Sequence, residues 1–372
     1  MSENIQYIWQ SARWPDWSFD LAEISDTLSR VHYQQGLLLG RMRDLGMDVR
    51  QQAVLSALTE DVVKTSAIEG EQLNAQSVRS SLARRLGVDV GALAPADRGV
   101  EGVVEMILDA AGKFDQKLTE ERLFAWHAAL FPTGYSGMSK INVARYRDDK
   151  LGAMQVVSGR MGREKVHYQA PPAERIEQEM RAFIDWLNTE TPADLFVKAA
   201  IAHLWFLTLH PFDDGNGRIA RAIADLLLAK ADKSAQRFYS LSAQVQYKRL
   251  EYYDILEQTQ KGRLDTGQWI KWFLTTIAEA MQAAHSQLDG VLYKTRFWQK
   301  WADTSLNERQ IKVLNRLLDG FDGKLNNRKW VAVAKCSRDT ALRDITDLLH
   351  KGILTKAEGS GRSVHYDLAG LE

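Results

Sequence analysis

The stretch His210-Pro-Phe-Asp-Asp-Gly-Asn-Gly-Arg-Ile-Ala-Arg221 decides the fold of this chain. It stands between a strongly apolar segment at 193–209 and a second one at 219–230, so the sequence predicts a helix, a glycine-rich turn and another helix. Two glycines around an asparagine permit positive φ and expose successive backbone N–H groups, and the following helix presents its positive dipole end. The turn is therefore predicted to cradle an anion.

The side chains around this turn supply a base, a metal ligand and a phosphate clamp. His210 can accept a proton near neutral pH, and Asp214 offers the hard carboxylate oxygen that Mg²⁺ prefers. Arg218 and Arg221 are three positions apart, so on a helix they share one face and can hold neighbouring phosphates. We therefore expect the chemistry of the chain to be centred here.

This string resembles the signature of the Fic family, His-x-Phe-x-Asp/Glu-Gly-Asn-Gly-Arg-x-x-Arg, and each constrained position matches. The resemblance implies a protein adenylyltransferase, which moves AMP from ATP with Mg²⁺ onto a Ser, Thr or Tyr hydroxyl of a target protein or of the enzyme itself. By the same resemblance, His210 would be the general base, and Asp214 would hold Mg²⁺ between the α- and β-phosphates. Phe212 is expected to be a core anchor, and Asp213 is expected to be solvated.

The remaining positions of the signature are implied to bind the nucleotide. The backbone N–H groups from Gly215 to Gly217, together with Asn216, would hold the α-phosphate in line for attack. Arg218 and Arg221 would bind the outer phosphates and stabilise the leaving pyrophosphate. The resemblance thus implies ATP and Mg²⁺ as the cofactors of the site.

A second motif, Thr65-Ser66-Ala67-Ile68-Glu69-Gly70, lies at the end of a predicted helix, with a glycine suited to the position after the C-cap. It resembles the family's inhibitory pattern, Ser/Thr-x-x-x-Glu-Gly/Asn. The resemblance implies that Glu69 pairs with Arg221 and keeps this cation from the γ-phosphate, so that the resting enzyme is slow. The alternatives are an ordinary surface salt bridge, worth about 0–1 kcal/mol, and a glutamate that supports AMP removal, as in some relatives.

Outside these motifs, apolar residues recur at helical spacing over most of the chain, in the segments 21–58, 73–86, 100–111, 120–130, 173–187, 244–260 and 266–292. The exception is 154–168, which is predicted to form a β-hairpin; together with 144–147 it resembles the family's flap, along which a target peptide aligns. The sequence therefore predicts a mainly α fold. An N-terminal helical region (1–95) carries the inhibitory motif, a Fic core (96–293) carries one hairpin flap, and a linker at 294–304 leads to a C-terminal unit (303–372).

Several aromatic side chains and histidines have a structural interpretation beside a functional one. The tryptophan-rich segment 8–17 is expected to pack irregularly against the body of the protein. Three histidines lack a second ligand type at metal spacing, so no zinc site is predicted at His127, His167 or His203. Three tyrosines downstream of the signature could stack on adenine or pack in the core: Tyr247, Tyr252 and Tyr253.

The C-terminal unit resembles a winged helix, with helices expected at 306–318, 331–335 and 337–351 and a hairpin around 359–362. In DNA-binding proteins of this kind the third helix enters the major groove, where Arg338, Thr340 and Arg343 could reach bases or phosphates. Two observations oppose DNA binding: the segment from 303 onward has 12 Lys/Arg against 10 Asp/Glu, and three acids share that helix, namely Asp339, Asp344 and Asp347. A protein-contact role or a homodimer interface is therefore left equally open.

The composition of the chain narrows the classes of function and of location that remain open. The 372 residues include 48 Lys/Arg and 48 Asp/Glu, so no global field draws the chain to nucleic acid or to anionic lipid. A single cysteine and the lack of a signal or membrane segment predict a cytoplasmic protein without a membrane partner. The expected function is AMP transfer. The alternatives are a DNA-binding regulator with a nucleotide-sensing Fic module, and transfer of phosphate or phosphocholine by the same scaffold.

Overall fold

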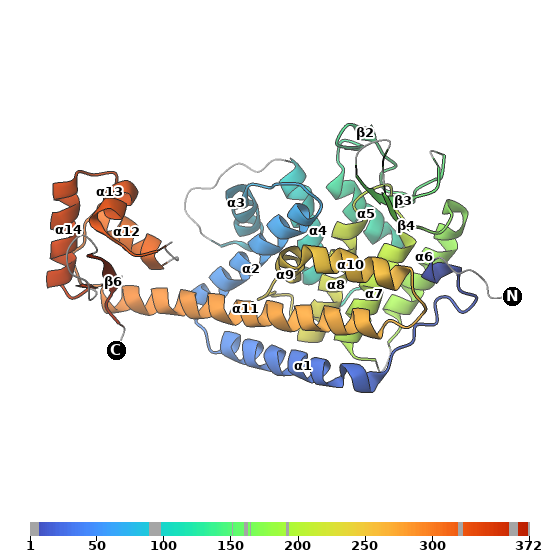
Figure 1. Ribbon diagram of the computed structural model, residues 1–372, viewed down its shortest axis with the longest axis horizontal. Helices are drawn as coiled ribbons and strands as arrows, with labels where there is room; N and C mark the ends of the chain where they lie inside the picture. The colour runs from blue at the N-terminus through green and yellow to red at the C-terminus, as the bar shows by residue number, and fades with distance from the viewer. Residues whose placement is uncertain are drawn as a thin grey trace. The chain divides into compact units, whose positions relative to one another are not determined.

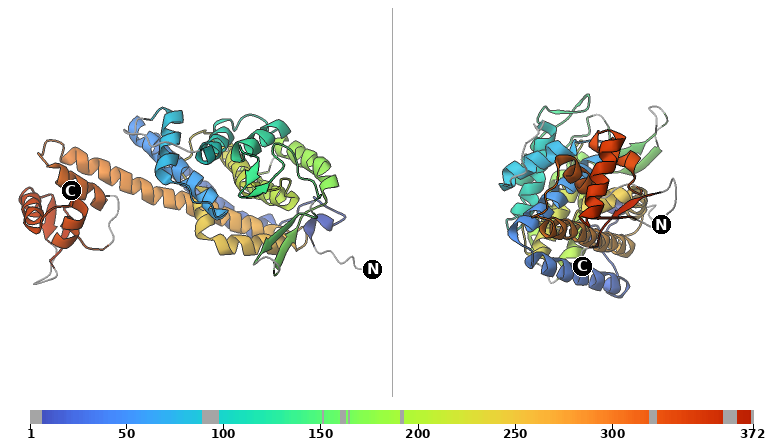
Figure 2. Two further views of the ribbon diagram at one scale, coloured as in Figure 1. Left: turned by 90° about the horizontal axis from the view of Figure 1, so that it is seen from above. Right: turned by 90° about the vertical axis from the view of Figure 1, so that its left-hand side faces the viewer.

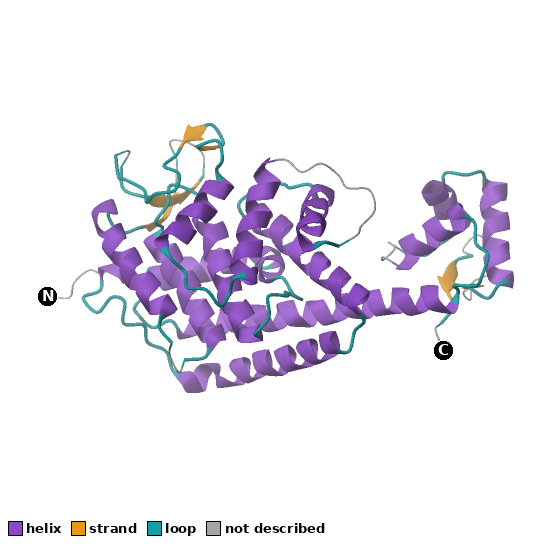
Figure 3. Ribbon diagram, turned by 180° about the vertical axis from the view of Figure 1, so that it is seen from behind, coloured by secondary structure: helices purple, strands orange, loops and turns teal. Residues whose placement is uncertain are grey.

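Helices supply nearly all of the regular structure in this computed structural model (Figure 1; purple in Figure 3). The structure describes residues 7–88, 98–150, 152–159, 163, 165–190, 193–318, 323–356 and 364–370. Within them, the strands form two-stranded antiparallel sheets and no larger sheet. The predicted mainly α fold is confirmed. The chain divides into two compact units, Met1–His285 and Ser286–Glu372.

The first unit is a helical bundle. Its helices are α1 (Leu21–Arg43), α2 (Met47–Ile68), α3 (Ala75–Leu86), α4 (Arg98–Gly112), α5 (Glu120–Leu130), α6 (Ala173–Asn188), α7 (Leu195–Leu209), α8 (Asn216–Asp232), α9 (Leu241–Tyr247), α10 (Arg249–Gln260) and the first part of α11 (Gly267–Lys300). Every residue of α7 after Leu195 is buried, because this helix is apolar on all sides, as a central helix is. No helix in the described residues has both the length and the apolar character needed to cross a membrane.

The helical segment expected over 21–58 is divided in the structure. α1 ends at Arg43 and α2 begins at Met47, after Gly46 in an extended conformation. α1 lies beside the first part of α11 (Figure 1): the backbone N of Ser18 donates to the Leu264 carbonyl at 2.9 Å near one end, and Arg41 Nη1 lies 3.3 Å from His285 Nδ1 near the other. The break frees α2 to leave this layer and to pack against α3, α8 and α9.

The predicted hairpin is formed by β3 (Gln155–Ser158) and β4 (Lys165–Gln169), and most of its expected turn at 160–163 lies outside the described residues. The N-terminal segment lies beside it (Figure 2), and its tryptophans pack there, as expected: Trp9 Nε1 donates to the Gln169 carbonyl at 2.9 Å, and Trp14 packs in the same cluster. A second, smaller hairpin, β1 (Tyr135–Ser136) with β2 (Ser139–Lys140), was not predicted. Its two-residue strands are too short to produce an alternating pattern.

The second unit contains α12 (Glu308–Leu318), α13 (Asn327–Ala334), α14 (Arg338–His350) and the hairpin of β5 (Leu354–Lys356) and β6 (Tyr366–Leu368). Its own core is built around buried residues that include Phe297, Trp330 and Ile345. The expected linker at 294–304 is wrong over its first half, because α11 continues to Lys300 and buries Phe297 in this core. The expected loop at 359–362 lies outside the described residues.

Candidate active site

The end of α7 places His210. This residue follows Leu209 in a left-handed conformation, with φ 48° and ψ 57°. Arg147 holds the bend from outside the helix: its Nε donates to the His210 carbonyl at 2.8 Å, and its backbone N donates to the Pro211 carbonyl at 2.9 Å. Because Arg147 is itself buried, these contacts fix the direction in which the imidazole leaves the helix.

The imidazole of His210 is in the state that a general base requires. Its Nδ1 lies 3.3 Å from the Leu207 carbonyl. Since a carbonyl can only accept, Nδ1 carries the hydrogen and Nε2 keeps its lone pair. Burial lowers the pKa of His210 to about 4, because desolvation disfavours the charged ring. The ring is therefore neutral at physiological pH.

Asn216 closes the turn between the two helices. Its Oδ1 accepts from Phe212 N at 3.0 Å, and its Nδ2 donates to the Phe212 carbonyl at 2.8 Å. Phe212 is fully buried, as expected of a core anchor. Gly215 has φ +82°, and a Cβ there would lie 2.8 Å from Phe131 Cε2, so only glycine fits. The side chain of Asn216 thus holds the turn itself, and its backbone N–H belongs to the first turn of α8.

Glu69 stands over the N-terminus of α8. The first N–H groups of a helix have no carbonyl partner within it, and they attract negative charge. A Cβ built on Gly217 would lie 2.1 Å from Glu69 Oε1 and 3.2 Å from Arg221 Nη1. The missing side chain at Gly217 therefore makes room for an anionic group, and in this structure the carboxylate of Glu69 fills that room.

Arg221 makes the predicted contact with Glu69. Its Nη2 donates to Glu69 Oε1 at 2.7 Å and to the Thr65 carbonyl at 3.0 Å, while its Nε donates to Thr65 Oγ1 at 2.7 Å. Arg221 is buried, and its Nη1 has no hydrogen-bond partner among the described residues. Burial opposes the charge of Arg221, but the neighbouring Glu69 carboxylate outweighs it and raises the pKa. A buried cation with an unused donor therefore lies beside the cradle.

Arg218 is held by a residue that the sequence did not indicate. Its Nη1 donates to Glu71 Oε2 at 2.8 Å, and its guanidinium lies 5.1 Å from the centre of the Phe131 ring. Its Nε is buried without a hydrogen-bond partner among the described residues. Glu71 stands two positions after Glu69, across the Gly70 turn. Both arginines of the signature are thus paired with carboxylates from the loop that follows α2.

Asp214 is the candidate ligand for Mg²⁺. Its Oδ1 accepts from Gly215 N at 2.6 Å, and its Oδ2 accepts from the Ser136 hydroxyl of β1, a contact that the sequence did not predict. Mg²⁺ is commonly held by one or two carboxylates together with substrate phosphates and water. One half-buried carboxylate beside an anion cradle fits that mode of binding. Groups of three or more His, Cys, Asp or Glu that could form a complete protein site are absent from the described residues.

Asp213 has a structural contact, contrary to the expectation that it is merely solvated. Its Oδ2 accepts from Asn142 N at 2.7 Å. Next to it, His127 stacks on Phe212 with ring centres 4.3 Å apart, accepts at Nδ1 from Ala144 N at 3.2 Å, and lies 3.2 Å from the Asp214 carbonyl through Nε2. The segment 142–147 is therefore fastened to the turn at several points.

Two of the three tyrosines considered for adenine stacking, Tyr252 and Tyr253, have other partners. Tyr252 is buried, and its hydroxyl lies 2.9 Å from His203 Nε2, so both residues pack in the core. Tyr253 donates from its hydroxyl to the Ile68 carbonyl at 3.4 Å, at the end of α2. Tyr247 is 84% exposed. Of the three, Tyr253 is the one that contacts the loop carrying Glu69.

His167 fastens the hairpin to α10. Its Nδ1 lies 2.6 Å from Glu257 Oε2, and its Nε2 lies 2.6 Å from Ser158 Oγ. These partners are a carboxylate and a hydroxyl from neighbouring elements of the first unit. The contacts give this histidine a positioning role for the hairpin.

Two family models match the chain. Residues 7–88 match a domain of unknown function, DUF4172, and residues 117–228 match the Fic/DOC family. The second match contains the whole signature, whereas Glu69 and Thr65 fall within the first. The contact between Glu69 and Arg221 therefore joins the two domains.

Curated relatives are distant. The chain is 24% identical over 217 residues to the protein adenylyltransferase Fic of Nematostella vectensis, which covers 57% of this chain and 45% of that protein. It is 38% identical over 60 residues to the protein adenylyltransferase fic-1 of Caenorhabditis elegans, covering 16% and 12%. The chain thus spans less than half the length of these relatives.

Solved structures show the same fold. A Fic family protein from Desulfovibrio desulfuricans matches with a TM-score of 0.51 and 19% identity, over 93% of this chain and 97% of the other. A Fic domain signalling protein from Bacteroides thetaiotaomicron matches with a TM-score of 0.52 and 18% identity, over 71% and 97%. The chain therefore contains a Fic/DOC domain preceded by a DUF4172 domain, and it is a distant relative of the Fic protein adenylyltransferases.

Proposed function

We propose that this protein is an adenylyltransferase that moves AMP from ATP onto a Ser, Thr or Tyr hydroxyl of a target protein, or of a second copy of itself. The observation that carries the proposal is the buried Arg221, whose Nη1 has no hydrogen-bond partner in the described part of the chain and lies beside the helix N-terminus at Gly217. Buried guanidinium groups are costly unless their donors are used. The phosphates of a nucleotide would use them.

The same groups divide the work of holding ATP. The first-turn N–H groups of α8 face the α-phosphate, and Arg218 and Arg221 face the outer phosphates. Asp214 would hold Mg²⁺, and the bound ion would supply positive charge that neutralises the phosphates. The target aligns along the hairpin β3–β4, where Val157 and Val166 are exposed.

In the chemical step, His210 Nε2 accepts the proton of the target hydroxyl. The hydroxyl oxygen then forms a bond to the α-phosphorus of ATP, and the bond from that phosphorus to the bridging oxygen breaks. Pyrophosphate leaves with the electron pair of that bond, and Arg218 and Arg221 stabilise its charge. The geometry of His210 supports this role, because Arg147 fixes its backbone and Leu207 fixes its tautomer.

The resting protein is inhibited in this proposal. Glu69 fills the cradle at Gly217 and accepts a hydrogen bond from Nη2 of Arg221. Its negative charge therefore lies where the phosphates of ATP would bind, and it repels them. Glu71 holds Arg218 in the same way. The two ion pairs differ in exposure: the Glu69 side chain is 31% exposed, and the Glu71 side chain is 49% exposed. Because solvent screens the more exposed pair better, the ion pair of Glu69 with Arg221 is the stronger of the two.

Replacing Glu71 with glutamine should tighten binding of Mg-ATP by about 2- to 5-fold, because an exposed ion pair is worth up to about 1 kcal/mol. Isothermal titration calorimetry of the full chain measures this. The matched control is Glu177→Gln, which removes a glutamate paired with Arg181 on α6, away from the signature. Equal affinity in wild type and Glu71→Gln, or an equal gain in the control, would contradict the role given to Glu71.

The activity should resist mild acid. Because the pKa of His210 is lowered to about 4, the base stays neutral as the pH falls from about 8 to about 6. We expect kcat/KM for the acceptor protein, measured with saturating Mg-ATP on the Glu69→Gly variant, to be flat through this range. A decline centred near the ordinary histidine pKa of about 6.5 would show that the ring is not desolvated in the working enzyme.

Mass spectrometry of the Glu69→Gly protein after incubation with ATP and Mg²⁺ tests the proposed reaction. The expected result is covalent AMP on a hydroxyl residue of the protein or of an added target. Addition of phosphate, or of phosphocholine when its nucleotide donor is supplied, would reassign the transferred group. The absence of any adduct, with ATP binding retained, would refute the transferase proposal.

A further inference from the structure

The second unit carries a helix-turn-helix. α13 and α14 are joined by the three residues 335–337, in which Lys335 has φ 52° and Ser337 caps α14 by accepting from Thr340 N at 3.2 Å. Both helices contribute to the core of the unit, through Trp330 and Ile345 among others. Two helices joined by so short a turn are the arrangement in which many DNA-binding proteins carry their recognition helix.

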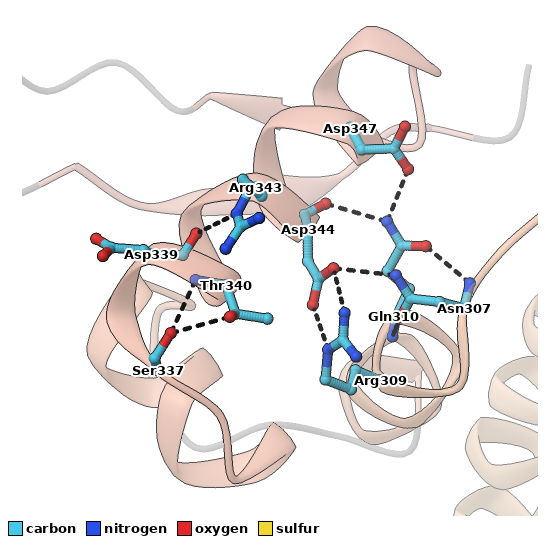
Figure 4. A network of polar contacts seen from close by, with 9 residues as sticks. All are labelled: Asn307, Arg309, Gln310, Ser337, Asp339, Thr340, Arg343, Asp344 and Asp347. Carbon is cyan, nitrogen blue, oxygen red and sulfur yellow. Dashed lines mark hydrogen bonds and ion pairs between the residues drawn. The ribbon is translucent and has the colours of Figure 1, made fainter.

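Two of the three acids of α14 that opposed DNA binding have partners on α12 (Figure 4). Asp344 is 5% exposed and accepts from Arg309 Nε at 2.9 Å and from Arg309 Nη2 at 3.0 Å. Asp347 accepts from Gln310 Nε2 at 2.8 Å and from Lys351 Nζ at 2.5 Å. These two carboxylates are paired on the side of α14 that faces α12. Their cationic partners Arg309 and Lys351 offset the charge of these two carboxylates.

Exposed cations lie on α14 and next to its start. Arg338 and Arg343 are exposed on α14, Lys335 is exposed in the turn, and Arg328 is exposed at the start of α13. Asn327 Nδ2 donates to the Arg338 carbonyl at 3.2 Å, which brings the start of α13 beside the start of α14. Arg328, Lys335, Arg338 and Arg343 are here called the basic face. No described residue forms an ion pair with them.

The residues between these cations suit a nucleic acid groove. Within α14, all of which is described, Leu342 is 52% exposed and Thr346 is also exposed. Asp339 is exposed as well, and the side chain of Asp347 is 45% exposed and paired with Lys351. Apolar and threonine methyl groups contact thymine in the major groove, and arginine contacts guanine or phosphate. A helix of 13 residues is roughly 20 Å long and fits a groove about 12 Å wide.

We propose that the basic face binds double-stranded DNA, with α14 in the major groove. The four cations of the basic face contact phosphates and base edges, and Leu342 and Thr346 contact the bases between them. The neutral overall charge of the protein does not oppose this, because phosphate contacts are made by local cations rather than by the net field. This inference is independent of the proposed AMP transfer.

Fluorescence anisotropy of the full chain with a labelled duplex of about 30 base pairs and mixed sequence tests the inference. The variant is Arg338→Glu with Arg343→Glu. The matched control is Lys312→Glu with Arg316→Glu, which makes the same charge change at two exposed positions of α12 in the same unit. We expect wild-type binding that weakens with salt, a loss of about 10-fold or more in the basic-face variant, a salt dependence reduced by about two ions, and little change in the control.

Two results would overturn the inference. The first is that the wild type does not bind the duplex at low salt. The second is an equal loss of DNA affinity in the basic-face variant and in the control variant, which would indicate unspecific charge attraction. If the wild-type protein self-associates but does not bind DNA, and the basic-face variant does not self-associate, the surface is assigned to protein contact. If the charge reversal unfolds the unit by circular dichroism, Arg338→Gln with Arg343→Gln makes the same comparison. AMP transfer should be the same in all these variants.

Discussion

The Glu69→Gly variant should transfer AMP on the order of 10²-fold faster than wild type, the scale of the penalty for a misplaced reacting group. The carboxylate occupies the space above Gly217 and takes one donor of Arg221, so its removal both empties the cradle and releases the cation. The measurement is the initial rate of AMP incorporation from labelled ATP. Glu177→Gly on α6 is the matched control, and it should stay at the wild-type rate.

Adding Arg221→Ala to Glu69→Gly should remove most of the gain. The released guanidinium is the group that holds the outer phosphates, so the two changes should be strongly non-additive, as expected for residues in contact. Arg221→Ala alone also strips three hydrogen bonds from the end of α2, which makes a thermal melt of each variant necessary. If Glu69→Gly binds ATP but transfers AMP no faster than wild type, Glu69 is an ordinary helix-end ion pair.

Replacing His210 should reduce transfer by about 10²- to 10⁴-fold, the usual contribution of a general base, with little loss of nucleotide affinity. The His210 variants are made in the Glu69→Gly protein, because its rate of AMP transfer should be high enough to measure. His32→Ala, at an exposed histidine paired with Asp194, the N-cap residue of α7, is the control and should keep the parent rate.

The backbone at His210 requires a second variant. Its φ of 48° is strained for alanine, whereas asparagine tolerates the left-handed region. His210→Asn should therefore keep the turn and still lose the base. Full transfer by a folded His210→Asn protein would remove this residue from the mechanism, and a loss in His210→Ala alone would indicate a distorted turn.

The parts of this molecule that could be predicted are those with local causes. α5 has the predicted bounds because Thr119 caps its start and apolar periodicity runs to Leu130. The Glu69–Arg221 contact joins segments far apart in the chain, yet it was expected because two separate motifs imply it.

The missed contacts have no such local signal. Ser136 reaches Asp214 from a strand of two residues, and Glu71 reaches Arg218 from a loop with no pattern of its own. The two hydrogen bonds by which the Asn216 side chain closes the turn likewise have no signal in the sequence. The linker expected at 294–304 is wrong over its first half for a similar reason. Phe297 packs in a core that is formed by helices following it in the chain.

The position of Glu69 at the end of α2, on the same chain as Arg221, makes this contact independent of protein concentration. Glu69 and Arg221 lie on one chain and in one compact unit, so their encounter is unimolecular and its local concentration is set by the fold. The fraction of molecules with this contact formed is then independent of the amount of protein in solution. An inhibitor on a separate chain is lost on dilution, whereas this contact persists in a single molecule.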